Sequence, residues 1–120
     1  MTGTSYQKGQ QTEQAAEQYL ITQGLIPIAR NIRFRTGEID LIMQDGHYRV
    51  FIEVRFRKHA RFGSAAESIN YNKQQRLIRS AMLYNQRYPS NQPWRIDAVV
   101  LTPGQTENYH FQWLQSAIHG

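Results

Sequence analysis

Two short acidic stretches, predicted to form neighbouring strands of a hairpin, constrain the fold of this chain most strongly. The first runs from Gly37 to Ile42 and the second from Phe51 to Arg55, with the turn signal Asp45-Gly46 between them. Both carry acidic residues where a strand with no task for them would carry Val or Thr. Because buried carboxylates are costly unless they are paired or bound to a metal, the pattern indicates a divalent-cation site.

Alternation along the two strands predicts which acids meet. Glu38 and Asp40 share one face of the first strand, and Glu53 lies on one face of the second. A two-residue loop at Asp45-Gly46 would place Glu38 directly opposite Glu53 and Asp40 diagonal to it. Since carboxylates directly opposite one another repel, we expect either a metal ion or an arginine between them.

The first predicted helix, residues 8–23, supplies a third acid. Glu13 lies on the same side as Ala16 and Leu20 and therefore faces the sheet, whereas Glu17 is turned further toward solvent. Carboxylates with no thiolate or histidine partner suit Mg²⁺ or Mn²⁺ rather than Zn²⁺. Each acid alone could equally cap a helix or pair with an arginine, but three converging acids favour a metal.

The remaining periodicity predicts an α/β fold with a mixed central sheet flanked by helices. The order is α-β-β-β-α-β-β, and a stub of helix is expected to close the chain. Strands are predicted over residues 25–34, 38–43, 48–57, 95–101 and 109–113. The second helix is predicted over residues 70–88, with an apolar stripe of Leu77, Ile78, Ala81 and Met82. With 120 residues we expect a single domain spanning 1–120, of which residues 1–7 are disordered.

Composition narrows the class of protein. No apolar run is long enough to span a membrane, the N-terminus lacks the apolar core of a signal peptide, and cysteine is absent. We therefore expect a cytoplasmic protein without disulfides or thiolate metal sites. The net charge of +5 favours an anionic partner such as nucleic acid.

Basic residues follow the second acidic strand and continue on the second helix, where they could contact phosphates or simply form a solvated surface. The candidates for nucleic-acid binding are Arg57, Lys58, Arg61, Lys73 and Arg76. Gln74 faces inward, where it could position a metal-bound water or a phosphate, or cap neighbouring backbone. The stretch from Ser64 to Glu67 matches a capping box. Asp97 is expected to occupy an edge or a salt-bridged position of its strand, and Trp94 and Trp113 to belong to the core and its rim.

The acidic residues resemble the PD-(D/E)xK superfamily of restriction-endonuclease-like folds, whose pattern is a helix Glu, a strand Asp and then Glu-x-Lys. The match is closer to the YraN family of uncharacterised bacterial proteins. It is carried by Lys8-Gly9-x-x-x-Glu13, Gly37-Glu38-Ile39-Asp40-Leu41-Ile42, Val50-Phe51-Ile52-Glu53-Val54-Arg55-x-Arg57, Phe62-Gly63-Ser64-Ala65-Ala66-Glu67-Ser68, Lys73-Gln74-x-x-Leu77 and Arg95-Ile96-Asp97-Ala98-Val99. The helix and both acidic strands are also similar to archaeal Holliday junction resolvases, which supports Glu13 over Glu17.

This resemblance implies a metal-dependent endonuclease acting on DNA rather than RNA, in structured or single-stranded form. Glu13, Asp40 and Glu53 would be ligands of Mg²⁺ or Mn²⁺, with Arg55 also catalytic. Glu38 and Gln74 would be auxiliary residues.

Arg55 stands where the superfamily has Lys. It can stabilise phosphate charge but cannot take a proton from water. Two alternatives therefore stay open. One is a nucleic-acid-binding module of the same fold with weak or no catalysis, and the other is a structural protein that uses the acidic patch for pairing. The oligomeric state is also open, with a dimer among the options.

Overall fold

The structure, a computed structural model, describes residues 5–58, 69–105 and 108–118. Its elements follow the predicted order. They are α1 (Ser5–Thr22), β1 (Ile26–Phe34), β2 (Gly37–Asp45), β3 (Tyr48–Phe56), α2 (Tyr71–Arg87), β4 (Trp94–Pro103) and β5 (Tyr109–Ile118). Within these described ranges, no helix is long and apolar enough to cross a membrane.

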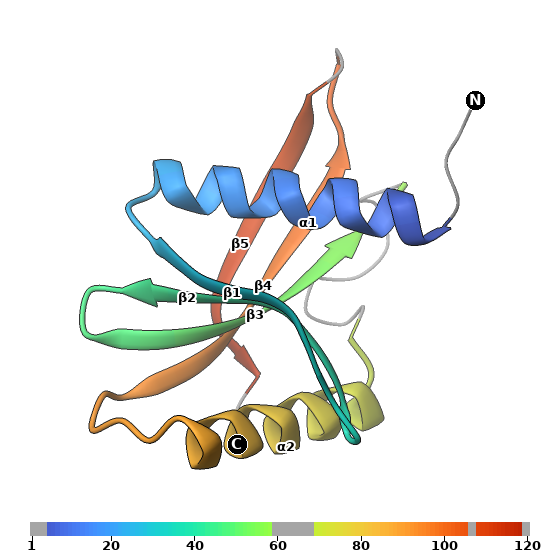
Figure 1. Ribbon diagram of the computed structural model, residues 1–120. Coiled ribbons are helices and arrows are strands. Elements are labelled where there is room, and N and C mark those ends of the chain that lie inside the picture. Colours follow the sequence, from blue (N-terminus) through green and yellow to red (C-terminus); the bar gives the residue numbers. More distant parts are fainter. Residues whose placement is uncertain (1–4, 59–68, 106–107, 119–120) are drawn as a thin grey trace.

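The five strands form one sheet in the order β1-β2-β3-β4-β5. All neighbours pair antiparallel except β3 and β4, which are parallel and are connected through α2. A parallel pair needs such a crossover, because a tight turn reverses the chain and can therefore join only antiparallel strands. Helix α1 covers one face of the sheet and α2 the other (Figure 1). The predicted α/β architecture is confirmed, and it is that of a restriction-endonuclease-like fold.

Each face of the sheet has its own apolar core. The core under α1 includes Leu20, Leu41, Met43, Val50 and Ile52. The core over α2 includes Ile42, Phe51, Leu77, Ala81 and Tyr84. Successive residues of the central strands therefore point into opposite cores, as expected for a sheet covered on both sides.

The last strand is longer than the sequence indicates, and the predicted closing helix is wrong. Strand β5 continues to Ile118, which pairs with Ile96 of β4. The pairing shifts register near Ser116, whose φ is +52°. The backbone N–H of Ser116 donates to the carboxylate of Asp97 over 2.8 Å, so a buried acid from β4 holds this segment in the sheet.

Two smaller differences concern the helices. Helix α1 begins at Ser5, three residues before the predicted start. In α2, Met82 is 57% exposed although the expected apolar stripe included it. The buried stripe instead continues from Leu77 through Ala81 to Tyr84, which lie four and then three residues apart on one side of the helix.

The turn between β2 and β3 lies one residue further along the chain than predicted. Asp45 pairs with Tyr48, so the two turn residues are Gly46 and His47, and Gly46 has the positive φ (+59°) of such a turn. This moves the register by two residues, which keeps every side chain on its face. It also aligns Glu53 with Asp40 rather than with Glu38.

Candidate metal centre

The acids gather where β2 and β3 separate. The pairing of these strands ends at Leu41 and Ile52, and from there β2 bends toward α2 while β3 continues beside β4 (Figure 1). Asp40 is the next residue of β2, and its Oδ2 accepts a hydrogen bond from the backbone N–H of Val54 over 2.8 Å. The Asp40 carboxylate therefore bridges the two strands just beyond their last backbone pair.

Three carboxylates lie close together at this fork. One oxygen each from Glu13 of α1 and from Glu38 and Asp40 of β2 lie within 4.8 Å of one another. Asn31 of β1 joins two of them, because its Nδ2 donates to Glu13 over 2.6 Å and to Glu38 over 2.9 Å. Asn31 has a φ of +53°, a left-handed conformation that Asn adopts more readily than most residues.

Glu53 of β3 lies beside this group rather than within it. The residue is only 4% exposed, and its Oε2 is 3.8 Å from Nζ of Lys73 on α2. That distance is an ion pair but too long for a hydrogen bond. Among the described residues, no hydrogen-bond partner reaches this buried oxygen. A buried carboxylate oxygen that accepts no hydrogen bond is costly, so a further positive group at the site would stabilise it.

Burial and the neighbouring acids raise the pKa of Asp40. Burial, followed by the negative charge of Glu53, raises the pKa of Asp40 from 3.8 to about 9, and the charge of Glu13 adds to the increase. The N–H of Val54 acts in the opposite direction by stabilising the ionised form. Asp40 therefore holds a proton at neutral pH unless a cation compensates the neighbouring charges.

The pKa of Glu53 is raised as well. Burial raises the pKa of its carboxyl group, and the positive charges of Lys73 and Arg55 counteract part of this increase. The negative charges of Glu13 and Glu38 raise it further. A divalent cation would reverse the balance for both acids, since it favours the ionised carboxylates that would bind it.

The donor set suits a hard cation. Every candidate ligand is a carboxylate oxygen, which Mg²⁺ and Mn²⁺ prefer. Glu13, Glu38 and Asp40 offer oxygens close enough together to hold one ion, and Glu53 of β3, whose charge acts on Asp40, lies beside them. The buried oxygen of Glu53, which accepts no hydrogen bond from the described residues, adds an observation independent of the acidic group itself.

The other predicted site residues lie at varying distances from the acids. Arg55 is half-buried on β3, and its charge acts on Glu53. Arg57 is half-buried, and Lys58 is exposed at the end of the described segment. Arg76 is exposed on α2. Arg61 and the predicted capping box from Ser64 to Glu67 lie outside the described residues.

Gln74 faces backbone rather than the acids. Its Nε2 donates to the carbonyl oxygen of Ile69 over 2.8 Å, just before the start of α2. Of the two roles considered for Gln74, the observed contact is the capping of neighbouring backbone. Asn70 caps the same helix end by accepting from the N–H of Lys73.

The expectation that Glu17 turns toward solvent is wrong. The residue is 8% exposed, and its carboxylate lies 3.7 Å from Nε of Arg30 on β1. Helix phase alone misplaces it, because β1 runs beside α1 and Arg30 covers this side of the helix. Glu38 also has an arginine partner, since Arg33 Nη2 donates to its Oε2 over 3.1 Å.

Asp97 is confirmed as a structural ion-pair residue. It is fully buried and accepts hydrogen bonds from Arg95 Nε at 3.0 Å and from Trp113 Nε1 at 2.9 Å. Trp113 is thereby fixed at the edge of the core. Trp94 packs edge-on against Phe51, with ring centroids 5.7 Å apart, as expected for a residue at the core rim.

Two contributors to the site escape sequence reasoning. In the sequence, Asn31 looks like any other polar residue of a strand. Because Asn adopts positive φ more readily than most residues, an Asn within a predicted strand can indicate an irregularity there. Lys73 was predicted only as a phosphate contact. Its approach to Glu53 depends on how α2 packs across the sheet, which no local pattern specifies.

A mixed sheet between two helices, with acids where β2 and β3 separate, defines an α/β protein of restriction-endonuclease-like fold. The chain belongs to the Uncharacterised protein family UPF0102, the YraN family, whose profile matches residues 12–101. A UPF0102 protein of Saccharophagus degradans is 48% identical over 111 residues, covering 91% of this chain and 90% of the relative. One of Methylobacillus flagellatus is 49% identical over 111 residues, covering 92% and 96%.

Proposed function

We propose that this protein is a cytoplasmic, metal-dependent nuclease that hydrolyses phosphodiester bonds of structured or single-stranded DNA. The observation that carries the proposal is the convergence of Glu13, Glu38 and Asp40 within 4.8 Å at one fork of the sheet, with the buried carboxylate of Glu53 beside them acting on Asp40. The burial and mutual repulsion that raise the pKa of Asp40 to about 9 are costs that a bound cation would offset. The net charge of +5 fits a polyanionic substrate.

Each residue has a proposed role. Glu13, Asp40 and Glu53 would hold one Mg²⁺ or Mn²⁺, which when bound supplies a Lewis acid for the scissile phosphate and lowers the pKa of an attacking water. Asn31 holds Glu13 and Glu38 in place through its two hydrogen bonds.

Two positively charged side chains would act on the substrate. Arg55 and Lys73, whose charges both act on Glu53, would stabilise the negative charge that develops on the phosphate. A guanidinium group does not act as a base in proteins, so Arg55 would bind and orient the phosphate without accepting a proton. Arg57, Lys58 and Arg76 would add contacts to the backbone of the nucleic acid.

A nucleic-acid-binding module with weak or no catalysis is the second candidate. Arg55 favours it, because a permanently charged guanidinium replaces the lysine of the superfamily pattern. In this version the acids would still hold a cation, and the cation would contribute to binding alone.

A cleavage assay separates the two functions. Purified protein is incubated with labelled duplex, single-stranded, flap and four-way-junction DNA in Mg²⁺, Mn²⁺ or EDTA. Asp40→Asn and Glu53→Gln test the acids, and Glu17→Gln is the matched control, because it removes a carboxylate from the same region outside the acidic group. The nuclease proposal predicts metal-dependent cleavage that both test variants lose and the control retains. Salt-sensitive binding without cleavage would favour the second candidate.

A further inference from the structure

Helix α2 has an unusual distribution of charge. Its residues Tyr71–Arg87 include Lys73, Arg76, Arg79 and Arg87 but no acid. Lys73 lies in the first turn, where the helix dipole disfavours positive charge. Lys73, Arg76 and Arg79, all in the N-terminal half, are also spaced three residues apart, so they repel one another along the helix surface. An anionic ligand on this half of α2 would relieve both costs.

The same half of α2 borders a groove of about 410 Å³. It is lined by Tyr71, Asn72, Gln75, Arg76 and Arg79. Tyr71 is 70% exposed, so much of its side chain is accessible to a ligand. A groove that combines an exposed aromatic ring with two guanidinium groups offers both stacking and phosphate contacts.

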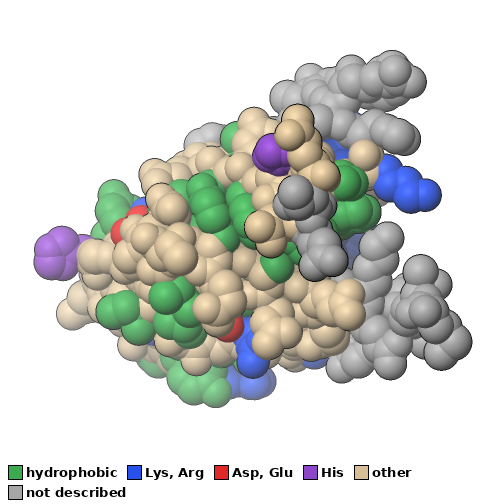
Figure 2. All heavy atoms as spheres, turned by 90° about the horizontal axis from the view of Figure 1, so that it is seen from above, with side chains coloured by type: hydrophobic (Ala, Val, Ile, Leu, Met, Phe, Trp, Pro, Cys, Tyr) green, Lys and Arg blue, Asp and Glu red, His purple; other side chains and the backbone are tan. Residues whose placement is uncertain are grey.

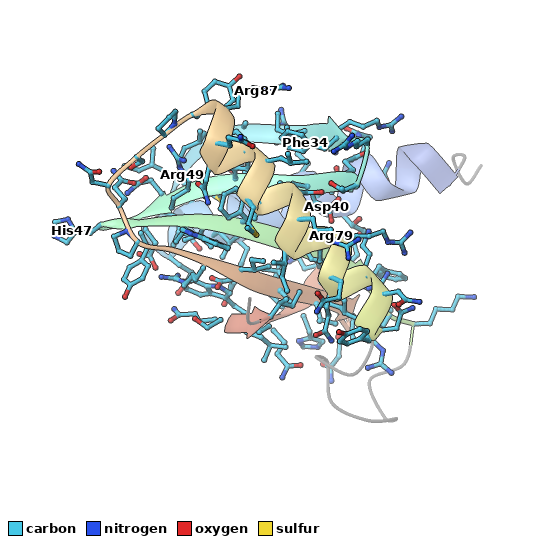
Figure 3. All side chains as sticks on the ribbon, turned by 90° about the horizontal axis from the view of Figure 1, so that it is seen from below. Phe34, Asp40, His47, Arg49, Arg79 and Arg87 are labelled. Atoms are coloured by element: carbon cyan, nitrogen blue, oxygen red, sulfur yellow. The ribbon has the colours of Figure 1, made fainter. Side chains whose placement is uncertain are left out.

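The groove leads toward the acidic fork. A smaller pocket of about 110 Å³, lined by residues that include Glu38, Lys73 and Arg76, shares Arg76 with it. Figure 3 looks onto α2, with Arg79 labelled on the helix and Asp40 labelled on β2 behind it. The opposite side of the molecule, seen in Figure 2, presents mainly uncharged side chains among the described residues. A polyanion that reaches the acids is therefore best accommodated along α2.

We propose that this groove binds an unpaired segment of nucleic acid, with a base stacked on Tyr71 and adjacent phosphates on Arg76 and Arg79. An unpaired segment is required because bases inside a duplex present no free face to an aromatic side chain. The inference rests on the proposed nuclease function and specifies its substrate as a strand that is single-stranded next to the scissile phosphate. The same strand would continue past Arg76 to the acids.

Binding measured in EDTA tests this independently of cleavage. Fluorescence anisotropy compares a labelled single-stranded oligonucleotide with the duplex of the same sequence, at low salt. Tyr71→Ala is expected to weaken single-strand binding by about fivefold or more, the effect of losing one stacked base, and to leave duplex binding within about twofold. Tyr71→Phe retains the ring and should bind like the wild type.

Arginine variants provide the second arm. Arg79→Ala is expected to weaken single-strand binding more than Arg87→Ala, because Arg87 lies on the same helix outside the groove. The proposal is overturned if Tyr71→Ala binds the single strand like the wild type, or if it loses affinity for both DNA forms equally. It is also overturned if the wild type binds neither form.

A different result would refute the proposed nuclease function. Asp40→Asn leaves the groove intact, so it should keep the binding of the single strand in EDTA while losing metal-dependent cleavage. Loss of the Tyr71 effect with cleavage retained would count against the groove alone. A normal thermal unfolding transition for each variant shows that a lost affinity does not reflect a lost fold.

Discussion

The ammonium group of Lys73 lies 3.8 Å from the carboxylate of Glu53, although the two residues belong to α2 and β3. This contact brings a lysine to the acids from a different element than the superfamily pattern uses. It also stabilises the ionised form of Glu53, because the charge of Lys73 lowers the pKa that burial raises. Helix α2 thus contributes to the acidic fork as well as to the apolar core.

Removing the charge of Lys73 should therefore slow cleavage. Lys73→Met is expected to reduce the single-turnover rate by about 100-fold, the usual effect of losing one group that stabilises transition-state charge. Lys73→Arg keeps the charge and should retain more of the rate. Full activity of Lys73→Met, with unchanged thermal stability, would contradict this role.

The stability of the metal-free protein should depend on pH in a direction set by Asp40. Its pKa is raised to about 9 in the folded protein from 3.8, so the folded state holds the proton more tightly than the unfolded state. The resulting stabilisation is complete below about pH 4 and is lost as the pH rises through about 9.

Urea unfolding in EDTA measures this effect. The free energy of unfolding should fall between mildly acidic and alkaline pH in the wild type, and much less in Asp40→Asn, which cannot ionise. The pKa of Glu53 is raised in the same direction and leaves a residual slope. A flat wild-type profile would show that burial does not perturb Asp40.

Asn31 should be needed for both its backbone and its side chain. Asn31→Gly removes the hydrogen bonds to Glu13 and Glu38 but adopts positive φ without strain. Asn31→Ala removes the same bonds and adds a left-handed conformation that costs a residue with Cβ about 1–2 kcal/mol. Chemical denaturation should find the Ala variant less stable than the Gly variant by about this amount. Equal stabilities would contradict the backbone argument.

Asp97 should control stability without affecting the acidic fork. Asp97→Ala leaves Arg95 without one of its two carboxylate partners, and the N–H groups of Trp113 and Ser116 without their acceptor. Breaking a buried ion pair from one side costs about 3–5 kcal/mol, measurable as a lower free energy of unfolding. Metal affinity of the folded fraction should stay unchanged.

Local patterns account for most of the fold. Alternation and the turn signal predict the β2–β3 hairpin, and the spacing of Leu77 and Ala81 predicts α2. These signals come from neighbouring residues, so sequence reasoning can find them. Segment 114–118 lacks such a signal, because β4 and the buried Asp97 hold it as a strand.

The acids that gather at the fork were predictable from the sequence, but their geometry and the contributions of Asn31 and Lys73 were not. Helix phase and strand alternation correctly directed Glu13 and Asp40 toward one another. The alignment of Glu53 with Asp40 depends on a turn that starts one residue later than expected. Positions set by packing between elements were missed, namely the burial of Glu17 under Arg30 and the approach of Lys73 to Glu53.

Isothermal titration calorimetry of the metal-free protein with Mn²⁺ tests the central claim, namely that the acids at the fork bind a cation. Glu13, Asp40 and Glu53 holding one ion predicts one saturable site per chain, weakened at least about tenfold in Asp40→Asn and in Glu53→Gln. Glu17→Gln should bind like the wild type. No saturable binding, or equal affinity in Asp40→Asn and the wild type, would contradict the proposed metal centre.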